Sequence, residues 1–126
     1  MKLKHIILLS VAFISNFSFA QNRIEGKVIN NDSLPLPLSI VFLKVQDSII
    51  DYSFSDFDGK FIFLKEYKQG MYLETHFIDE VNILKLDTLR NNLLIKMNFQ
   101  NKVSKEQLYN WHKEMFKKYK LEYKEE

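Results

Sequence analysis

The sequence predicts an all-β fold, a seven-stranded antiparallel sandwich, followed by one α-helix at its C-terminal end. Short segments that alternate polar and apolar residues recur about every eleven residues, and each ends in a turn signal, as in antiparallel sandwiches. From Ser104 onwards the apolar residues recur every three or four positions, which is the period of a helix. The chain has no cysteine, so we expect packing alone to hold the fold.

The first 20 residues have the three parts of a cleavable signal peptide. Lys2 and Lys4 supply a positive start, residues 6–14 an apolar run, and residues 18–20 a small-x-small cleavage site. A membrane anchor is the alternative, but the apolar run is about nine residues long and a spanning helix needs about 20. We therefore expect residues 1–20 to be removed and the protein to be exported to the periplasm, the outer membrane or the extracellular space.

Charge and cysteine content narrow the class of partner. Without residues 1–20 the chain has 16 basic and 16 acidic residues and no face dense in Lys or Arg, so no nucleic-acid partner is expected. The absence of cysteine excludes lipid attachment through a lipobox cysteine. The remaining chain of about 106 residues has room for one domain. We expect the β-sandwich over residues 21–100 and an amphipathic helical segment over residues 101–126.

Four strands are expected in the first half of the domain. Residues 30–33 end the first one, because Asn, Asp and Ser side chains bond their own backbone and favour turns. Pro35 and Pro37 cannot donate to a strand ladder, so they make an extended connection. Gly59 can take a positive φ and close a hairpin between the third and fourth strands. The four expected strands are 23–29, 39–45, 49–55 and 60–65.

Three more strands and the helix complete the chain. In the last strand, Leu93 and Ile95 fall on one face and Lys96 on the other, which is a half-buried pattern. Ser104 is followed three positions later by Gln107, the spacing of a capping box, so the helix should begin there. The three expected strands are 71–78, 81–86 and 93–99. The apolar stripe of the helix contains Leu108, Trp111, Met115, Tyr119 and Tyr123.

Four short motifs follow one another in a specific order: residues 26–28 (GKV), 34–37 (LPLP), 39–43 (SIVFL) and 55–61 (SDFDGKF). Their letters, order and spacing resemble the carboxypeptidase regulatory-like domain of Bacteroidetes envelope proteins, with its pattern G-x-V, P-L-P-G-A-x-V and T-D-x-D-G-x-F. The resemblance covers roughly residues 23–99. In two places it fails, because Leu38 stands where the family usually has glycine, and a Gly-Tyr pair is missing around residues 78–79.

The resemblance implies a transthyretin-like, seven-stranded Greek-key sandwich with no catalytic activity of its own. Such domains are found in front of outer-membrane TonB-dependent receptors or as accessory modules of exported proteins. No barrel follows in this sequence, so receptor function is not carried over. We therefore expect a non-catalytic binding or structural module of the cell envelope, with an unidentified envelope protein as its partner. The alternative is a free-standing or truncated accessory domain of a TonB-dependent receptor system, and an exported hydrolase comes third.

No catalytic, cofactor-binding or metal-binding residue is predicted. Asp56 and Asp58 suggest a calcium loop, but Tyr67 stands where an EF-hand needs a bidentate Glu, and a hairpin turn explains the pair without metal. His76 and His112 are the only histidines after the signal peptide, too few for a zinc site without a thiol. His76 is expected to point out of its strand into solvent. A hydrolase would need one of these two histidines as its base.

The outer face of one sheet is the most informative feature. If alternate residues of the second strand face the core, as the resemblance implies, Ile40 and Phe42 face outward, and exposed apolar pairs are usually covered. We expect the helix stripe to lie over them. The alternative is that the helix docks on another protein or on the membrane surface. The residues that would then face the partner are Ile40, Phe42, Trp111, Met115 and Tyr119.

Overall fold

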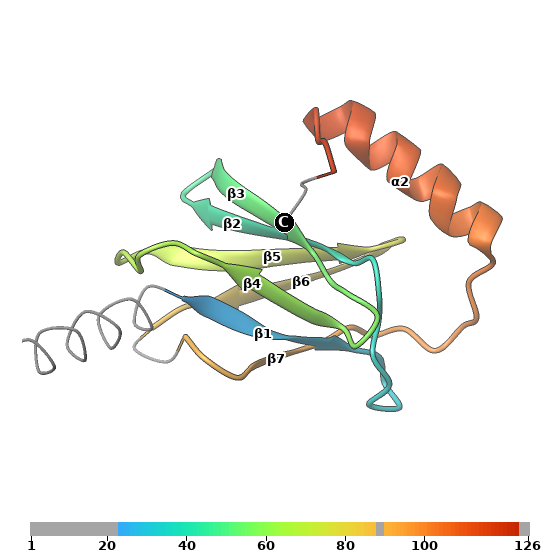
Figure 1. Cartoon of the computed structure of the whole chain (residues 1–126), viewed down its shortest axis with the longest axis horizontal. Coiled ribbons are helices and arrows are strands. Elements are labelled where there is room, and N and C mark those ends of the chain that lie inside the picture. The colour runs from blue at the N-terminus through green and yellow to red at the C-terminus, as the bar shows by residue number, and fades with distance from the viewer. Residues whose placement is uncertain (1–22, 88–89, 124–126) are drawn as a thin grey trace, which may run out of the picture.

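The computed structural model describes residues 23–87 and 90–123, which form seven β-strands and one α-helix (Figure 1). The expected signal peptide lies outside the described residues. All seven strands and the helix lie where the sequence predicts them, to within a few residues at each end. The strands are β1 (Ile24–Ile29), β2 (Ile40–Val45), β3 (Ser48–Phe54), β4 (Lys60–Phe63), β5 (Met71–Phe77), β6 (Glu80–Lys85) and β7 (Leu93–Lys96), and the helix is α2 (Lys105–Tyr119).

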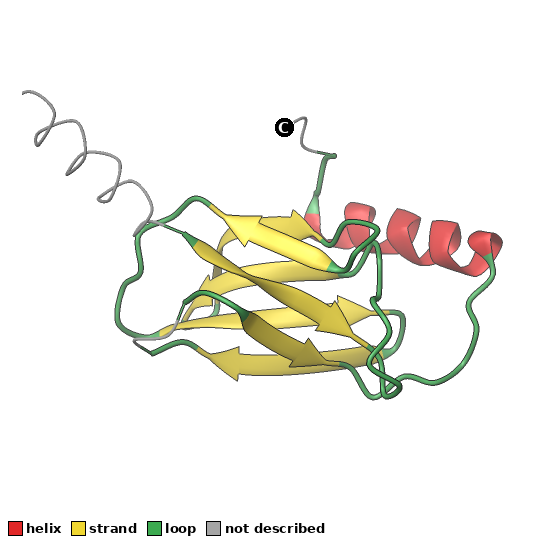
Figure 2. Cartoon of the chain, turned by 60° about the horizontal axis from the view of Figure 1, so that its bottom comes forward, coloured by secondary structure: helices red, strands yellow, loops and turns green. Residues whose placement is uncertain are grey.

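The strands form two sheets in a sandwich-like arrangement. One sheet has three strands in the order β4-β1-β7, and the other has four in the order β3-β2-β5-β6. Figure 2 shows the sheets as two layers, with α2 beside the four-stranded one. The buried apolar side chains form one cluster, which fills the space between the sheets and continues beneath α2. Its largest fully buried apolar side chains are Phe42, Phe63, Ile24, Ile40, Leu43, Leu73, Ile95, Met97, Val28 and Val41.

Strand alternation sorts the side chains between core and surface as the sequence predicts. In β7, Leu93 and Ile95 are buried, whereas Leu94 and Lys96 are exposed. This burial removes the apolar side chains from water, and each one fully buried stabilises the fold by roughly 1.5–3 kcal/mol before the entropy cost is counted. β2 departs from the alternation, because all of its first four residues are buried. Both faces of β2 are therefore covered.

The pairing of β1 with β7 is parallel, with Gly26 opposite Leu93 and Ile29 opposite Lys96. The expectation that every strand pair is antiparallel is therefore wrong here. The chain reaches β7 from β6, in the other sheet, and the Glu25 N–H donates to the Arg90 carbonyl at 2.9 Å just before β7 begins. β7 thus starts beside the start of β1 and runs the same way. Alternation predicts which face a side chain takes, but not the direction of the neighbouring strand.

The segment between β3 and β4 is a turn, as the sequence predicts, but the expected hairpin is wrong: β3 pairs with β2 and β4 with β1, so the turn joins the two sheets. The Asp56 carboxylate accepts hydrogen bonds from the backbone N–H groups of Asp58 and Lys60, at 2.9 and 2.8 Å. Gly59 has φ +77°, and a Cβ placed on it would lie 2.5 Å from the Val28 carbonyl oxygen. Only glycine fits both the backbone angle and the space. The turn thereby fixes the position of β4 against β1.

The helix begins with the predicted capping box. The Ser104 hydroxyl accepts from the Gln107 N–H at 3.1 Å, and the Gln107 side chain accepts from the Ser104 N–H at 3.1 Å. The helix ends at Lys120, which takes a left-handed conformation with φ 55° and donates its N–H to the Phe116 carbonyl. Residues at each end of the helix thus supply hydrogen-bond partners for backbone groups that the helix itself leaves unpaired. None of the helices among the described residues has the length and apolar character to cross a bilayer.

Candidate functional site: the outer face of the four-stranded sheet

The outer face of the four-stranded sheet carries an apolar half, which α2 covers. Ile40 and Phe42 point away from the inner core and are nevertheless fully buried. The Tyr119 ring lies 4.9 Å from the Phe42 ring and 6.2 Å from the His76 ring, between centroids, whereas Trp111 meets Phe77, on the inner side of β5, at 5.9 Å. The predicted packing of the helix stripe over this face is therefore confirmed by direct contacts.

The buried side of α2 is wider than the sequence predicts. His112 is 5% exposed, and its ring stacks on that of Phe116 with centroids 5.7 Å apart. Phe116 in turn stacks on Phe54 of β3 at 5.4 Å. Sequence reasoning missed His112 and Phe116 as packing residues. The spacing did carry a signal, because Leu108, His112 and Phe116 are each four residues apart.

Both ring nitrogens of His112 are engaged inside the chain. Nε2 lies 2.7 Å from the Leu38 carbonyl oxygen, so this nitrogen carries the proton and donates it. Nδ1 lies 3.0 Å from the Tyr123 hydroxyl, from which it accepts. The Tyr52 hydroxyl and the backbone of Glu122 exchange further hydrogen bonds at 3.1 Å. These contacts fasten both the helix and the residues after it to the sheet.

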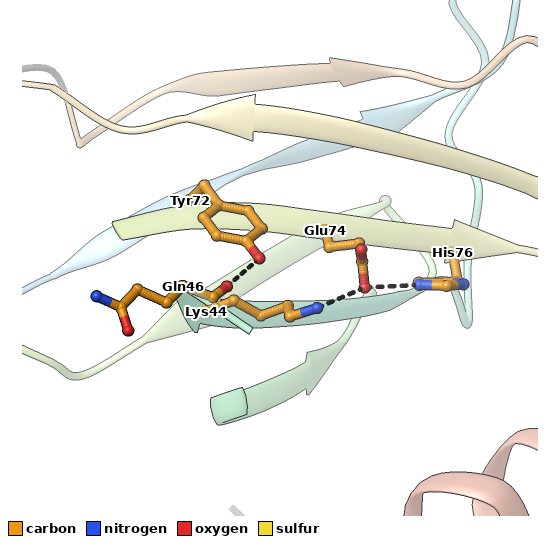
Figure 3. Close-up of polar contacts among 5 residues, drawn as sticks. All are labelled: Lys44, Gln46, Tyr72, Glu74 and His76. Atoms are coloured by element: carbon orange, nitrogen blue, oxygen red, sulfur yellow. Dashed lines mark hydrogen bonds and ion pairs between the residues drawn. The ribbon is translucent and has the colours of Figure 1, made fainter. Parts of the chain in front are cut away.

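A polar row continues the same face on β2 and β5 (Figure 3). Lys44 Nζ lies 3.4 Å from Glu74 Oε2, and His76 Nε2 lies 3.1 Å from the same oxygen. The Tyr72 hydroxyl donates to the Gln46 carbonyl at one end of the row. The side chains of Lys44, Glu74 and His76 are 15%, 19% and 14% exposed, so all three groups are largely withdrawn from water.

The two charged groups of the row hold each other in their ionised forms. Burial by itself would lower the pKa of Lys44, but the charge of Glu74 and the hydrogen bond to it raise that pKa above its usual 10.5. Burial would raise the pKa of Glu74, but the hydrogen bond with His76 and the charge of Lys44 lower it below 4.5. Glu74 is therefore a permanent anion at neutral pH, shared by two donors.

His76 has the strand parity that the sequence predicts, beside Tyr72 and Glu74 on the outer face. The expectation that it is solvated is wrong, because neighbouring rings cover it. Its ring meets that of Phe42 edge-on at 5.3 Å and that of Tyr119 at 6.2 Å. Strand alternation predicts the face of a side chain, whereas its exposure depends on what packs on that face.

The five residues predicted as partner-facing lie within this arrangement. Ile40 and Phe42 are fully buried, Trp111 and Met115 are at most 9% exposed, and Tyr119 is half-buried. All five belong to the contact between α2 and the sheet or lie directly beneath it. A partner would reach them only if the helix moved away.

The other candidate residues are engaged in contacts within the chain. In residues 23–87 and 90–123, no group of three His, Cys, Asp or Glu side chains is placed to hold a metal ion. Asp56 uses its carboxylate within its own turn. His76 and His112 come from β5 and α2, and each bonds a separate set of groups. Their contacts are those of packing and anchoring residues.

Comparison with protein-family models and with curated protein sequences gave no match. The family resemblance of residues 23–99 thus depends on the motifs alone.

Proposed function

We propose that this chain is a non-catalytic binding or structural module of the bacterial cell envelope, built as a Greek-key sandwich of the carboxypeptidase regulatory-like type and exported through a cleaved signal peptide. Its two-sheet architecture and its seven strands agree with that family. In this proposal the core sandwich is the scaffold, and α2 is an added element that seals the outer face of the four-stranded sheet.

The observation that carries the proposal concerns the two places where the motif resemblance fails. Leu38 replaces the family's glycine and has φ +62°, and Ile78, where the family's Gly-Tyr is missing, has φ +55°. Bulky residues rarely adopt this left-handed backbone, and glycine adopts it without strain. The chain thus keeps the backbone conformation that glycine favours at both positions, although the glycine itself has been replaced. Ser33, Gln46, Asn92 and Lys120 also have positive φ, so this agreement supports the family fold only together with the matching letters.

A non-catalytic role is supported by the chemistry of the two histidines. A general base needs a free ring nitrogen within hydrogen-bond reach of a substrate. The ring of His112 has both nitrogens bonded inside the chain, and the His76 side chain is 14% exposed beneath the rings of Phe42 and Tyr119, which limits the access of a substrate. Replacing His76 or His112 should therefore change stability, and no hydrolytic activity towards envelope substrates should depend on either residue.

The proposal is tested by expressing the full chain, tagged at its C-terminus, in a bacterium of the same envelope type. Mass spectrometry of the recovered protein should find an N-terminus at Gln21, in the periplasmic or outer-membrane fraction. Replacing Ala20 by tyrosine provides the control, because a bulky residue there blocks cleavage. An uncleaved chain in the cytoplasm would refute export.

Cross-linking in the same cells addresses the role of the module. A reproducible envelope protein attached to the chain is the expected result. Recovery of a TonB-dependent receptor would favour the alternative, an accessory domain of that system. Recovery of the monomer alone would contradict a role through a protein partner.

A further inference from the structure

A pocket of about 560 Å³ opens beside the three-stranded sheet. It is lined by residues of β1, β4 and β7, and its wall includes Ser53 and Phe54 from the end of β3. The inward neighbours of these lining residues, such as Val28, Phe63 and Ile95, fill the core. Because strand side chains alternate, the Lys27, Lys60, Ile62 and Leu94 side chains of the lining belong to the outer face of the three-stranded sheet.

Strand register places two lysines side by side on the floor of this pocket. Lys27 of β1 pairs directly with Lys60 of β4, and Leu94 of β7 pairs with Lys27 from the other side. Directly opposite side chains have their Cβ atoms about 5 Å apart, and like charges in this position repel. Lys60, Lys27 and Leu94 therefore lie side by side across the sheet, with the two cations at one end of the row.

The acidic residues of the pocket do not neutralise this pair. Glu25 bonds Arg23, with 3.2 Å between Oε2 and the guanidinium nitrogen. Asp56 accepts from the backbone of its own turn. Among the described residues, no carboxylate forms an ion pair with Lys27 or Lys60. The two lysines thus have no ion-pair partner of their own, and an anion placed between them would relieve their mutual repulsion.

Most of the remaining lining residues are apolar, with Ser53 and Asn92 as the polar exceptions. Leu94 is 60% exposed, and Ile62, beside Glu25 in the next row, is half-buried. Phe54 adds an aromatic wall. A pocket with apolar walls and a few polar groups at one end is the usual form of a small-molecule site.

We propose that this pocket binds a small amphiphilic anion, with its carboxylate or phosphate headgroup between Lys27 and Lys60 and its apolar chain against Leu94 and Ile62. A headgroup in this position accepts hydrogen bonds from both ammonium groups. The apolar chain covers side chains that are otherwise exposed to water. This inference rests on the proposed role as a binding module and names the ligand class for it.

The test uses octanoate and octyl phosphate as probes, with acetate, inorganic phosphate and octanol as the matched fragments. Titration calorimetry on purified protein without residues 1–20 should show both probes binding at least tenfold more tightly than any fragment. In amide NMR spectra the same titration should shift Lys27, Lys60 and Leu94. A preference for octyl phosphate would indicate a lipid-type phosphate, and a preference for octanoate a free fatty acid.

Substitutions then separate the pocket from general surface adsorption. Lys27→Gln and Lys60→Gln should each weaken probe binding about tenfold, because each removes one charge-assisted hydrogen bond. Neither should lower the unfolding temperature, since each also removes a like-charge repulsion. Lys85→Gln, on the exposed side of β6, is the control and should leave the affinity unchanged.

Two results would overturn the proposal. One is equal binding of octanoate and octanol, which would remove any role for the lysines. The other is an equal shift of Val81 and Ile83, the exposed apolar residues of β6. Because purified protein is used, failure here leaves the test of export and partner binding unaffected.

Discussion

His112 of the C-terminal helix donates a hydrogen bond to the carbonyl of Leu38, 74 residues earlier in the chain, with 2.7 Å between the two atoms. Leu38 precedes β2 and takes a left-handed backbone conformation. Its N–H donates to the Ser55 carbonyl at 2.9 Å, so both of its backbone polar groups are satisfied. The histidine therefore joins the helix to a left-handed residue that lies just before β2.

Replacing His112 by phenylalanine should destabilise the protein by about 2 kcal/mol, because the ring volume is kept but the Leu38 carbonyl loses its donor. Urea unfolding followed by circular dichroism gives the free energy of unfolding. Tyr109→Phe, on the exposed side of the same helix, is the control and should change it by less than about 0.5 kcal/mol. Equal stabilities of wild type and His112→Phe would show that the bond is not formed in solution.

Leu38→Gly should relieve the left-handed strain, and Leu38→Ala should not. Both variants remove the same partly exposed side chain. The difference between their free energies of unfolding therefore measures the cost of the left-handed backbone conformation for a residue with a Cβ atom. We expect the glycine variant to be more stable than the alanine variant by about 1 kcal/mol. The measurement is again equilibrium unfolding in urea. An alanine variant as stable as the glycine variant would contradict the left-handed conformation at this position.

Met115→Ala should loosen the helix from the sheet and cost about 3 kcal/mol, because the methionine is buried where α2 meets the sheet. Trp111 is the single tryptophan of the chain and is 9% exposed, so its fluorescence reports the docking. The emission should shift to longer wavelength, and acrylamide should quench it faster. Glu114→Ala, on the exposed side, serves as the comparison. A native-like Trp111 signal in Met115→Ala would refute the packing role.

Gly59→Ala should be more destabilising than Gly70→Ala. Both glycines have positive φ, +77° and +90°, so both alanines are strained. At Gly59 the new methyl group also meets the Val28 carbonyl at 2.5 Å, whereas Gly70 has no atom within 4 Å of this position. We expect Gly70→Ala to lower the free energy of unfolding by about 1 kcal/mol, and Gly59→Ala to lower it by clearly more. Thermal unfolding of the two variants shows which one is less stable. Equal losses of stability would contradict the close approach of Gly59 to the Val28 carbonyl.

The row of Lys44, Glu74 and His76 should contribute stability over a defined pH window. The pKa of Glu74 is lower in the folded protein than in the unfolded chain. Its contribution to the free energy of unfolding is therefore complete above pH 4.5 and is lost as the pH falls through the folded-state pKa. The pKa of Lys44 is higher in the folded protein than in the unfolded chain. Its contribution to the free energy of unfolding is therefore complete below pH 10.5 and is lost as the pH rises through the folded-state pKa. The contribution should therefore be present from about pH 5 to pH 10.

Glu74→Gln tests this window. The variant should be less stable than wild type by about 1 kcal/mol at pH 7, and the difference should shrink below pH 4. Urea unfolding at several pH values measures it. Glu80→Gln, on the neighbouring strand β6, is the matched control and should show no such dependence. A difference between Glu74→Gln and wild type that does not change with pH would contradict the ion pair.

Local patterns in the sequence by themselves determined the elements of this protein. Alternation predicts the buried faces of strands such as β7, and the spacing of Ser104 and Gln107 predicts the start of the helix, because both depend on a few neighbouring residues. Asp56 and Gly59 likewise predict a turn, but not that the strands on its two sides belong to different sheets. The sequence also places Ile40 and Phe42 on an outer face that needs a cover, provided that alternate residues of that strand face the core.

Only the tertiary structure decided how these elements meet. The parallel direction of β7 beside β1, the ring contacts that cover His76 and the alignment of Lys27 with Lys60 all join residues far apart in the chain. No local period encodes such pairs, since each depends on the path of the connections and on the register between strands. The same holds for the bond between His112 and Leu38, which forms only once the helix has packed on the sheet.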